Sequence, residues 1–358
     1  MQLGFIGLKF SGKSTLFELL TKGKFESVQT GLAEYQRGQV IVPDKRIDHL
    51  SEMFNPRKTT YAQFDCIDVM GIPSTMRTDQ SAKYLEAVRQ TDALVAVIQA
   101  FEGYNTEGQL ATIDPVADLR HLEDELIFAD LLVVESRLEK VKHLKQRSAP
   151  QFDQHELDIL EKCHAALEEE KALRNIELSE NEKKIIRGFQ LLSLKPLMAV
   201  INCDEEHYKK RTETENIFKE SFSDIPVTSV SALTEKEIQE LDAEERDVFM
   251  EESGIETPAI DHVIATSYAA IGLISFFTVG EDEVRAWNLK APATAPEAAG
   301  VIHSDLQKGF IRAEVIAYDN FMEVNGSMAE AKSKGTVRLE GKEYIVKDGD
   351  ILNIRFNL

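Results

Sequence analysis

The 358-residue sequence predicts an α/β protein with a mostly parallel sheet, an inserted antiparallel helical hairpin and a separate C-terminal α+β domain. Three patterns support this fold class. Up to about residue 120, short apolar runs alternate with helical segments, as in βαβ units. Residues 118–176 then place apolar residues at three- and four-residue steps. After residue 273, short alternating strands are separated by turn signals such as Glu-Gly-Lys and Asp-Gly-Asp.

The composition bounds the function. With 43% hydrophobic and 29% charged residues, the chain fits an ordinary globular protein rather than a collagen-like or disordered one. The net charge of −21 argues against a large uniform basic face, so DNA is not an expected partner. Three widely spaced cysteines suit a reducing compartment, and no CxxC pair indicates a zinc or iron–sulfur site. No apolar run reaches eighteen residues and no leader pattern is present, so we expect a cytoplasmic protein without a membrane span.

The first motif lies close to the N-terminus. Residues 2–6 (QLGFI) predict a buried strand, and GLKFSGKST at 7–15 matches the phosphate loop G-x-x-x-x-G-K-[ST]. The glycines let backbone N–H groups face a phosphate, and the helix that follows adds its positive dipole end. Lys13 is the expected catalytic residue because it reaches the β- and γ-phosphates, and Ser14 offers its hydroxyl to Mg²⁺. The predicted nucleotide-binding residues of this loop are Lys9, Phe10, Ser11, Gly12, Lys13, Ser14 and Thr15.

A second strand, predicted at 61–68 (YAQFDCID), ends in an acid that is followed by a glycine. Asp68 is expected to hold Mg²⁺ through water, and the N–H of Gly71 to sense the γ-phosphate. The alternative is an ordinary strand-end turn. Ile72 occupies the place where Ras-like enzymes carry a water-orienting glutamine, and an apolar side chain cannot orient a water. Hydrolysis therefore needs another group to position the water.

Two apolar runs, 93–100 (ALVAVIQA) and 196–202 (PLMAVIN), predict central parallel strands. The second ends in Asn202-Cys203-Asp204-Glu205, where GTPases commonly have N-K-x-D with an aspartate that accepts from guanine. Asn202, Cys203 and Glu205 are therefore predicted to meet the base. The longer acid of Glu205 favours ATP over GTP, because it fits guanine poorly and adenine offers a donor at N6. The alternative is a capped strand-to-helix turn.

A further strand at 225–233 (IPVTSVSAL) contains Ser231 and Ala232. Their backbone N–H groups are expected to lie behind the base. By itself this segment would indicate no function.

The helical stretch predicts two antiparallel helices, 118–146 and 155–176, joined by a loop with Pro150. It interrupts the nucleotide domain, because the base-recognising strand arrives only at 196. We therefore expect a nucleotide-binding domain at 1–118 and 188–272, a hairpin at 119–187, and a last domain at 273–358. The hairpin tip, residues 137–147, holds five Lys or Arg against Glu139 alone, which indicates either an RNA contact or a solvated helix face.

These features together resemble the YchF / Obg-like ATPase family of phosphate-loop proteins. The most similar stretches are GEDEVRAW, TAPEAAGVIHSDLQKGFIRAEVIAYD and RLEGKEYIVKDGDILNIRFN. The resemblance implies that residues 273–358 form a TGS domain and that ATP is preferred to GTP, since the family motif N-x-x-E is met by Asn202 and Glu205. It also implies a ribosome, or another RNA-containing particle, as the partner.

The sequence departs from the family pattern at three places. Lys9-Phe10-Ser11 replaces the usual Pro-Asn-Val of the phosphate loop. Leu32 stands where the switch threonine is expected, and Thr30 is the nearest hydroxyl. No histidine occurs near Gly108, where the family has one implicated in hydrolysis. We therefore expect a divergent member.

Three functions remain open at this point. The first is a Mg²⁺-dependent regulator that hydrolyses ATP slowly and acts on the ribosome or on translation. The second is a nucleotide-binding scaffold without hydrolysis, or a GTP-specific switch protein. The third, a small-molecule kinase, is disfavoured because the sequence shows no arginine-rich lid.

Overall fold

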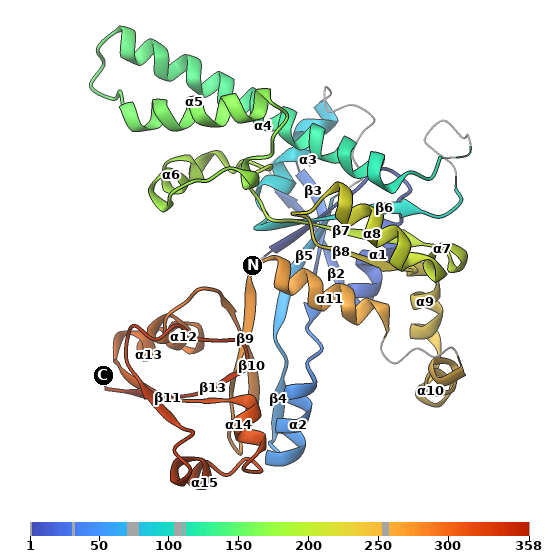
Figure 1. The fold of residues 1–358 in the computed structure, drawn as a ribbon, viewed down its shortest axis with the longest axis vertical. Helices are drawn as coiled ribbons and strands as arrows, with labels where there is room; N and C mark the ends of the chain where they lie inside the picture. Colours follow the sequence, from blue (N-terminus) through green and yellow to red (C-terminus); the bar gives the residue numbers. More distant parts are fainter. Residues whose placement is uncertain are drawn as a thin grey trace. The chain divides into compact units, whose positions relative to one another are not determined.

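The computed structural model describes residues 2–30, 33–69, 79–103, 110, 112–252 and 258–357 (Figure 1). The chain divides into two compact units. Unit 1 comprises Met1–Gln39 and Asp65–Val263, and unit 2 comprises Val40–Phe64 and Ile264–Leu358. The domain boundaries drawn from the sequence stay a prediction. No helix of the described residues is long and apolar enough to span a bilayer.

Unit 1 is built on a mostly parallel sheet, as predicted. Within the described residues the sheet has seven strands in the order β2-β3-β5-β1-β6-β7-β8. The strands β5, β1, β6, β7 and β8 pair in parallel, and β2 and β3 form an antiparallel pair. Their bounds are β1 (Gln2–Ile6), β2 (Phe25–Thr30), β3 (Ala33–Ile41), β5 (Gln63–Val69), β6 (Ala93–Ala100), β7 (Leu197–Cys203) and β8 (Val227–Val230). β6 and β7 are almost wholly buried, which explains their continuous apolar sequences.

Helices cover both faces of this sheet. On one face, α3, α4 and α8 bury Val88, Leu122 and Phe218 against β6 and β7. On the other, Phe17 of α1 meets Phe5 of β1 with ring centroids 6.2 Å apart. The helices are α1 (Lys13–Thr21), α3 (Asp79–Arg89), α4 (Pro115–Gln146), α5 (Gln154–Glu168), α6 (Glu180–Ile186), α7 (Glu205–Lys209), α8 (Arg211–Ser221), α9 (Ala232–Glu240), α10 (Ala243–Glu252) and α11 (Ala259–Ala270), with short 3₁₀ turns η1 (Leu173–Asn175) and η2 (Arg187–Phe189).

The inserted hairpin consists of α4 and α5, which lie side by side and project from the sheet (Figure 1). α4 begins at a signal readable in the sequence, because Asp114 accepts a hydrogen bond from the N–H of Ala117 at 3.0 Å and Pro115 follows it. Leu138 and Val141 of α4 pack against Leu160 of α5, in a core that also contains Cys163. The predicted antiparallel helical hairpin is confirmed.

The second hairpin helix ends earlier than predicted, at Glu168 instead of residue 176. Glu170 takes a left-handed φ of 56°. The N–H of Lys171 donates to the carbonyl of Ala166, and the N–H of Glu170 donates to the carbonyl of Leu167. These are the two bonds of a Schellman motif. Such a helix end usually carries glycine, so a glutamate at this position gave no stop signal.

One buried carboxylate joins the base of the hairpin to the chain that returns toward β7. Asp130 of α4 is fully buried. It accepts hydrogen bonds from the N–H of Leu192 at 2.9 Å, and from the N–H and hydroxyl of Ser193 at 2.7 and 2.8 Å. The guanidinium Nη1 of Arg89, from α3, lies 3.3 Å from the Asp130 carboxylate. The aspartate therefore connects three separate segments of unit 1.

Unit 2 holds the second sheet, which supports the α+β fold of the C-terminal TGS domain. In the described part of this unit the sheet has six strands in the order β12-β11-β13-β9-β10-β4. The strands are β4 (Lys58–Thr60), β9 (Leu273–Thr278), β10 (Glu283–Lys290), β11 (Phe310–Ala317), β12 (Arg338–Glu340) and β13 (Asp350–Phe356). The helices are α2 (Lys45–Phe54), α12 (Ala295–Ile302), α13 (Ser304–Lys308), α14 (Tyr318–Met322) and α15 (Met328–Ser333).

An unexpected feature of unit 2 is the contribution of residues 40–64. β4 pairs in parallel with β10, so that Lys58 lies opposite Glu283. Arg46 of α2 bonds to Asp348 at 2.6 Å and lies over the ring of Phe277. A segment from the first part of the sequence thus completes the C-terminal fold.

Candidate functional site

The phosphate-loop motif forms the turn between β1 and α1. Gly12, the residue before α1, has a left-handed φ of 81°, and Phe10 has one of 69°. Left-handed residues on either side of Ser11 bend the loop sharply, and turns of this kind are typical of loops whose backbone N–H groups bind an anion. Gly12 is required for space as well, because a Cβ there would lie 2.1 Å from the side-chain nitrogen of Asn202.

Lys13 lies where this loop meets the end of β5. Its side chain is 5% exposed, and its ammonium donates to the carboxylate of Asp68 and to the carbonyl of Val69. Burial lowers the pKa of Lys13 to about 7, while the adjacent carboxylate favours the charged form. The predicted lysine and the predicted acid, 55 residues apart in the chain, therefore meet.

Ser14 joins the same cluster. Its hydroxyl donates to the second carboxylate oxygen of Asp68 at 2.7 Å. A hydroxyl and a carboxylate are hard oxygen donors of the kind that Mg²⁺ prefers, so these two residues fit the ion. In the described ranges no group of three or more His, Cys, Asp or Glu could hold a metal, and phosphate and water oxygens would have to supply the other ligands.

Asn202, at the end of β7, connects the phosphate loop to the loop after β8. Its side-chain N–H donates to the carbonyl of Ser11 at 3.0 Å, and its carbonyl accepts from the N–H of Ala232 at 3.1 Å. The side chain is buried, and both ends of its amide are used within the protein. In this geometry Asn202 positions two loops, a role that its place in the sequence could not reveal.

The remaining predicted base residues lie around the same loops. Cys203 is buried, and burial together with the charge of Asp204 raises the pKa of its thiol to about 12. Glu205 is exposed in the first turn of α7, which Asp204 caps by accepting from the N–H of His207 at 2.8 Å. Ser231, buried at the start of α9, has its hydroxyl 2.9 Å from that of Thr234.

A cavity of about 400 Å³ opens beside these loops. It is lined by Glu102, Asp204, Glu205, Glu206, His207, Ser231, Leu233, Thr234 and Glu237. The predicted residues Glu205 and Ser231 both border it, and the other lining residues were not predicted. The cavity adjoins the segments that follow β7 and β8, at the carboxyl ends of parallel strands, where sheets of this kind bind their ligands.

Several positions singled out from the sequence cannot be placed in this geometry. Gly71 and Ile72, and the region of Gly108, lie outside the described residues, and so does the side chain of Thr30. Lys9, Phe10 and Thr15 all belong to the turn or to the first turn of α1.

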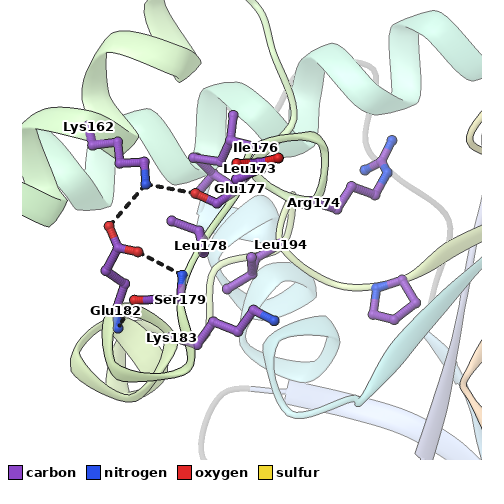
Figure 2. A pocket seen from close by; sticks show the side chains of 11 residues that line it. Lys162, Leu173, Arg174, Ile176, Glu177, Leu178, Ser179, Glu182, Lys183 and Leu194 are labelled. Carbon is purple, nitrogen blue, oxygen red and sulfur yellow. Dashed lines mark hydrogen bonds and ion pairs between the residues drawn. The ribbon is translucent and has the colours of Figure 1, made fainter.

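A larger cavity, of about 730 Å³, lies at the base of the hairpin (Figure 2). Lys162 of α5 crosses one side of it and donates to the carbonyl of Glu177 at 2.7 Å and to Glu182 at 3.0 Å. Lys183 is paired with Glu180 at 2.9 Å. No motif in the sequence pointed to this cavity, and its two lysines are already neutralised by neighbouring carboxylates.

Comparison with known proteins found similar chains. A family model named YchF-GTPase_C, described as a protein of unknown function (DUF933), matches residues 273–357. The chain is 40% identical to "Ribosome-binding ATPase YchF" of Bacillus subtilis (strain 168), over 99% of both chains. It is 37% identical to the protein of the same name in Escherichia coli O157:H7, again over 99% of both. The solved structure of the Schizosaccharomyces pombe YchF GTPase superposes with a TM-score of 0.82 at 27% identity, covering 99% of this chain and 97% of that one.

Proposed function

The chain belongs to the YchF family, and from this premise we propose that it is a nucleotide-binding protein that acts on the ribosome. In this proposal it binds ATP with Mg²⁺, binds GTP less well, and hydrolyses the bound triphosphate slowly. The observation that carries the proposal is the meeting of Lys13, Ser14 and Asp68 beneath a loop with two left-handed residues. The names of the relatives support the ribosome as partner and hydrolysis as activity.

Each residue of this cluster has a definite task in hydrolysis. The loop N–H groups hold the phosphates, and Lys13 stabilises negative charge on the transferring phosphoryl group. Ser14 and Asp68 would hold Mg²⁺, which when bound neutralises charge on the phosphate oxygens. Asn202 keeps the phosphate loop and the loop at Ala232 in one arrangement, so that phosphates and base are held together.

The base preference rests on Glu205, because Asn202 uses both ends of its side-chain amide within the protein. Glu205 stands at the start of α7, exposed at the cavity beside the loops, and is one methylene longer than the aspartate that accepts from guanine. Ser231 supplies a backbone group behind the base, whereas the N–H of Ala232 is bonded to Asn202. We propose that this arrangement favours adenine.

Single-turnover hydrolysis tests the proposal. Purified wild-type protein is mixed with a limiting amount of ATP and Mg²⁺, and released phosphate is followed against the Lys13→Ala variant. Release well above the variant supports hydrolysis. Nucleotide binding without any difference in release would establish the non-hydrolysing scaffold instead.

The ribosome contact is proposed at the hairpin tip. Two of its five basic side chains are occupied, since Arg137 bonds to Glu156 at 2.7 and 2.9 Å and Lys142 lies 3.6 Å from Glu161. The other three, Lys140, Lys145 and Arg147, are exposed and have no carboxylate partner within the described residues. Cations without a carboxylate partner suit phosphate oxygens of ribosomal RNA.

Replacing Lys140, Lys145 and Arg147 together by alanine is expected to weaken ribosome binding by about 10-fold or more. The salt dependence of binding should weaken as well. The slope of the logarithm of the ribosome-binding constant against the logarithm of the salt concentration should become shallower by about one unit for each lost phosphate contact, or by about three units for the triple variant. Ribosome cosedimentation at several salt concentrations measures both quantities. The matched control replaces Lys24, Lys219 and Lys236, which are exposed and unpaired elsewhere in the described part of unit 1. Equal losses of ribosome affinity in the two triple variants would contradict a contact at the hairpin tip.

A further inference from the structure

The apex of the phosphate loop has an unusual geometry. The N–H of Ser11 bonds to the carbonyl of Leu8 at 3.3 Å, so Lys9 and Phe10 are the two central residues of a four-residue turn. The left-handed φ of 69° at Phe10 is that of the third residue of a type II turn, where glycine or asparagine is usual. A phenylalanine in this conformation is strained, and such strain is concentrated at functional sites.

The same two residues are the ones the loop presents to solvent. Within residues 7–13, all of which are described, Lys9 and Phe10 alone are exposed, with Phe10 at 63%. The ring of Phe10 therefore adds nothing to the core that would compensate for the strain. The turn places Lys9 in the loop that is proposed to bind the phosphates, four residues before Lys13.

Lys9 differs from Lys13 in its partners. Lys13 is held by Asp68 and Val69, whereas Lys9 has no ion pair or hydrogen bond from its ammonium within the described ranges. Its ammonium sits on a flexible four-carbon stem. A phosphate held by the loop would neutralise it.

We propose that Lys9 is a second catalytic cation, which contacts the γ-phosphoryl group and stabilises the charge that develops on it during hydrolysis. This rests on the proposed function. In the reaction, a water oxygen forms a bond to the γ-phosphorus. The bond between that phosphorus and the bridging oxygen breaks, its electron pair remains on the β-phosphate oxygen, and the proton of the water passes to solvent, which gives ADP and inorganic phosphate. Lys9 transfers no proton in this step. It acts through the positive charge of its ammonium, as an arginine supplied in cis does in other phosphate-loop enzymes.

Three variants test the assignment: Lys9→Ala, Lys9→Arg and the control Lys24→Ala, which removes an exposed, unpaired lysine outside the loop. For each we would measure the single-turnover rate with ATP, the Kd for ADP, and binding of ADP with aluminium fluoride, which imitates the transferring phosphoryl group. Lys9→Ala should slow hydrolysis about 10- to 100-fold and lose the aluminium fluoride complex. Its Kd for ADP should stay within about twofold of wild type, and Lys9→Arg should retain most of the rate.

A Lys9→Ala rate equal to that of Lys24→Ala would overturn the assignment. An equal loss of affinity of Lys9→Ala for ADP and for ADP with aluminium fluoride would overturn it too. That result would show that Lys9 attracts nucleotide phosphates in general and not the transferring phosphoryl group. Failure of the proposed function gives a different result, in which the wild-type protein itself binds no nucleotide or releases no phosphate, and the Lys9 assignment falls with it.

Discussion

Replacing Lys13 by alanine is expected to reduce affinity for ATP by at least about 100-fold, because the lost ammonium would bond to two phosphate groups at about 1.5–3 kcal/mol each. The same change should lower the free energy of unfolding of the nucleotide-free protein by about 3–5 kcal/mol. It leaves the Asp68 carboxylate, which is 6% exposed, without its cation. Isothermal titration with ATP and urea unfolding measure the two effects.

The double variant Lys13→Ala with Asp68→Asn separates these effects. Removing both charges avoids a buried unpaired carboxylate, so most of the stability should return. Affinity for ATP should stay low, because the phosphate contact is still missing. If the single variant bound ATP with wild-type affinity, Lys13 would have no place in the phosphate site.

Replacing Asp130 by alanine is expected to cost about 3–5 kcal/mol of unfolding free energy. The change leaves buried N–H groups of Leu192 and Ser193 without acceptors and leaves Arg89 without its carboxylate. Because these groups join α3, α4 and the chain toward β7, the base of the hairpin should loosen. Urea unfolding followed by circular dichroism measures the loss.

Asp124 supplies the control, since it is exposed on the same helix and makes no ion pair within the described residues. The Asp124→Ala variant should change the free energy of unfolding by less than about 0.5 kcal/mol. A similar small loss in Asp130→Ala would show that the three hydrogen bonds contribute little.

Much of unit 1 was predictable because its signals are local. β6 and β7 are buried on both faces, and their sequences are apolar almost throughout. The phosphate loop carries its glycines and lysine at fixed spacing. The hairpin shows its helical period over many turns, so both helices were predicted. The first begins at Pro115 instead of residue 118, and the second ends at Glu168 instead of residue 176, where Glu170 replaces the usual glycine.

The rest depended on contacts between distant residues. Nothing local in residues 40–64 shows that β4 will pair with β10, more than two hundred residues later. The motifs showed which kinds of side chain lie in the site, but not which residues those side chains bond to. Asn202 was expected at the base, and its hydrogen bonds to Ser11 and Ala232 follow only from the arrangement of three loops.

Competition between ATP and GTP tests the central claim, that this is an adenine-nucleotide protein, most directly. Wild-type protein with Mg²⁺ and a labelled nucleotide is titrated with each triphosphate, and the Glu205→Asp variant serves as the matched control. The account predicts that ATP competes at least about 10-fold more strongly than GTP, a ratio that corresponds to about one net hydrogen bond. It also predicts that Glu205→Asp narrows the difference in affinity between the two triphosphates. A preference for GTP in the wild-type protein would contradict it.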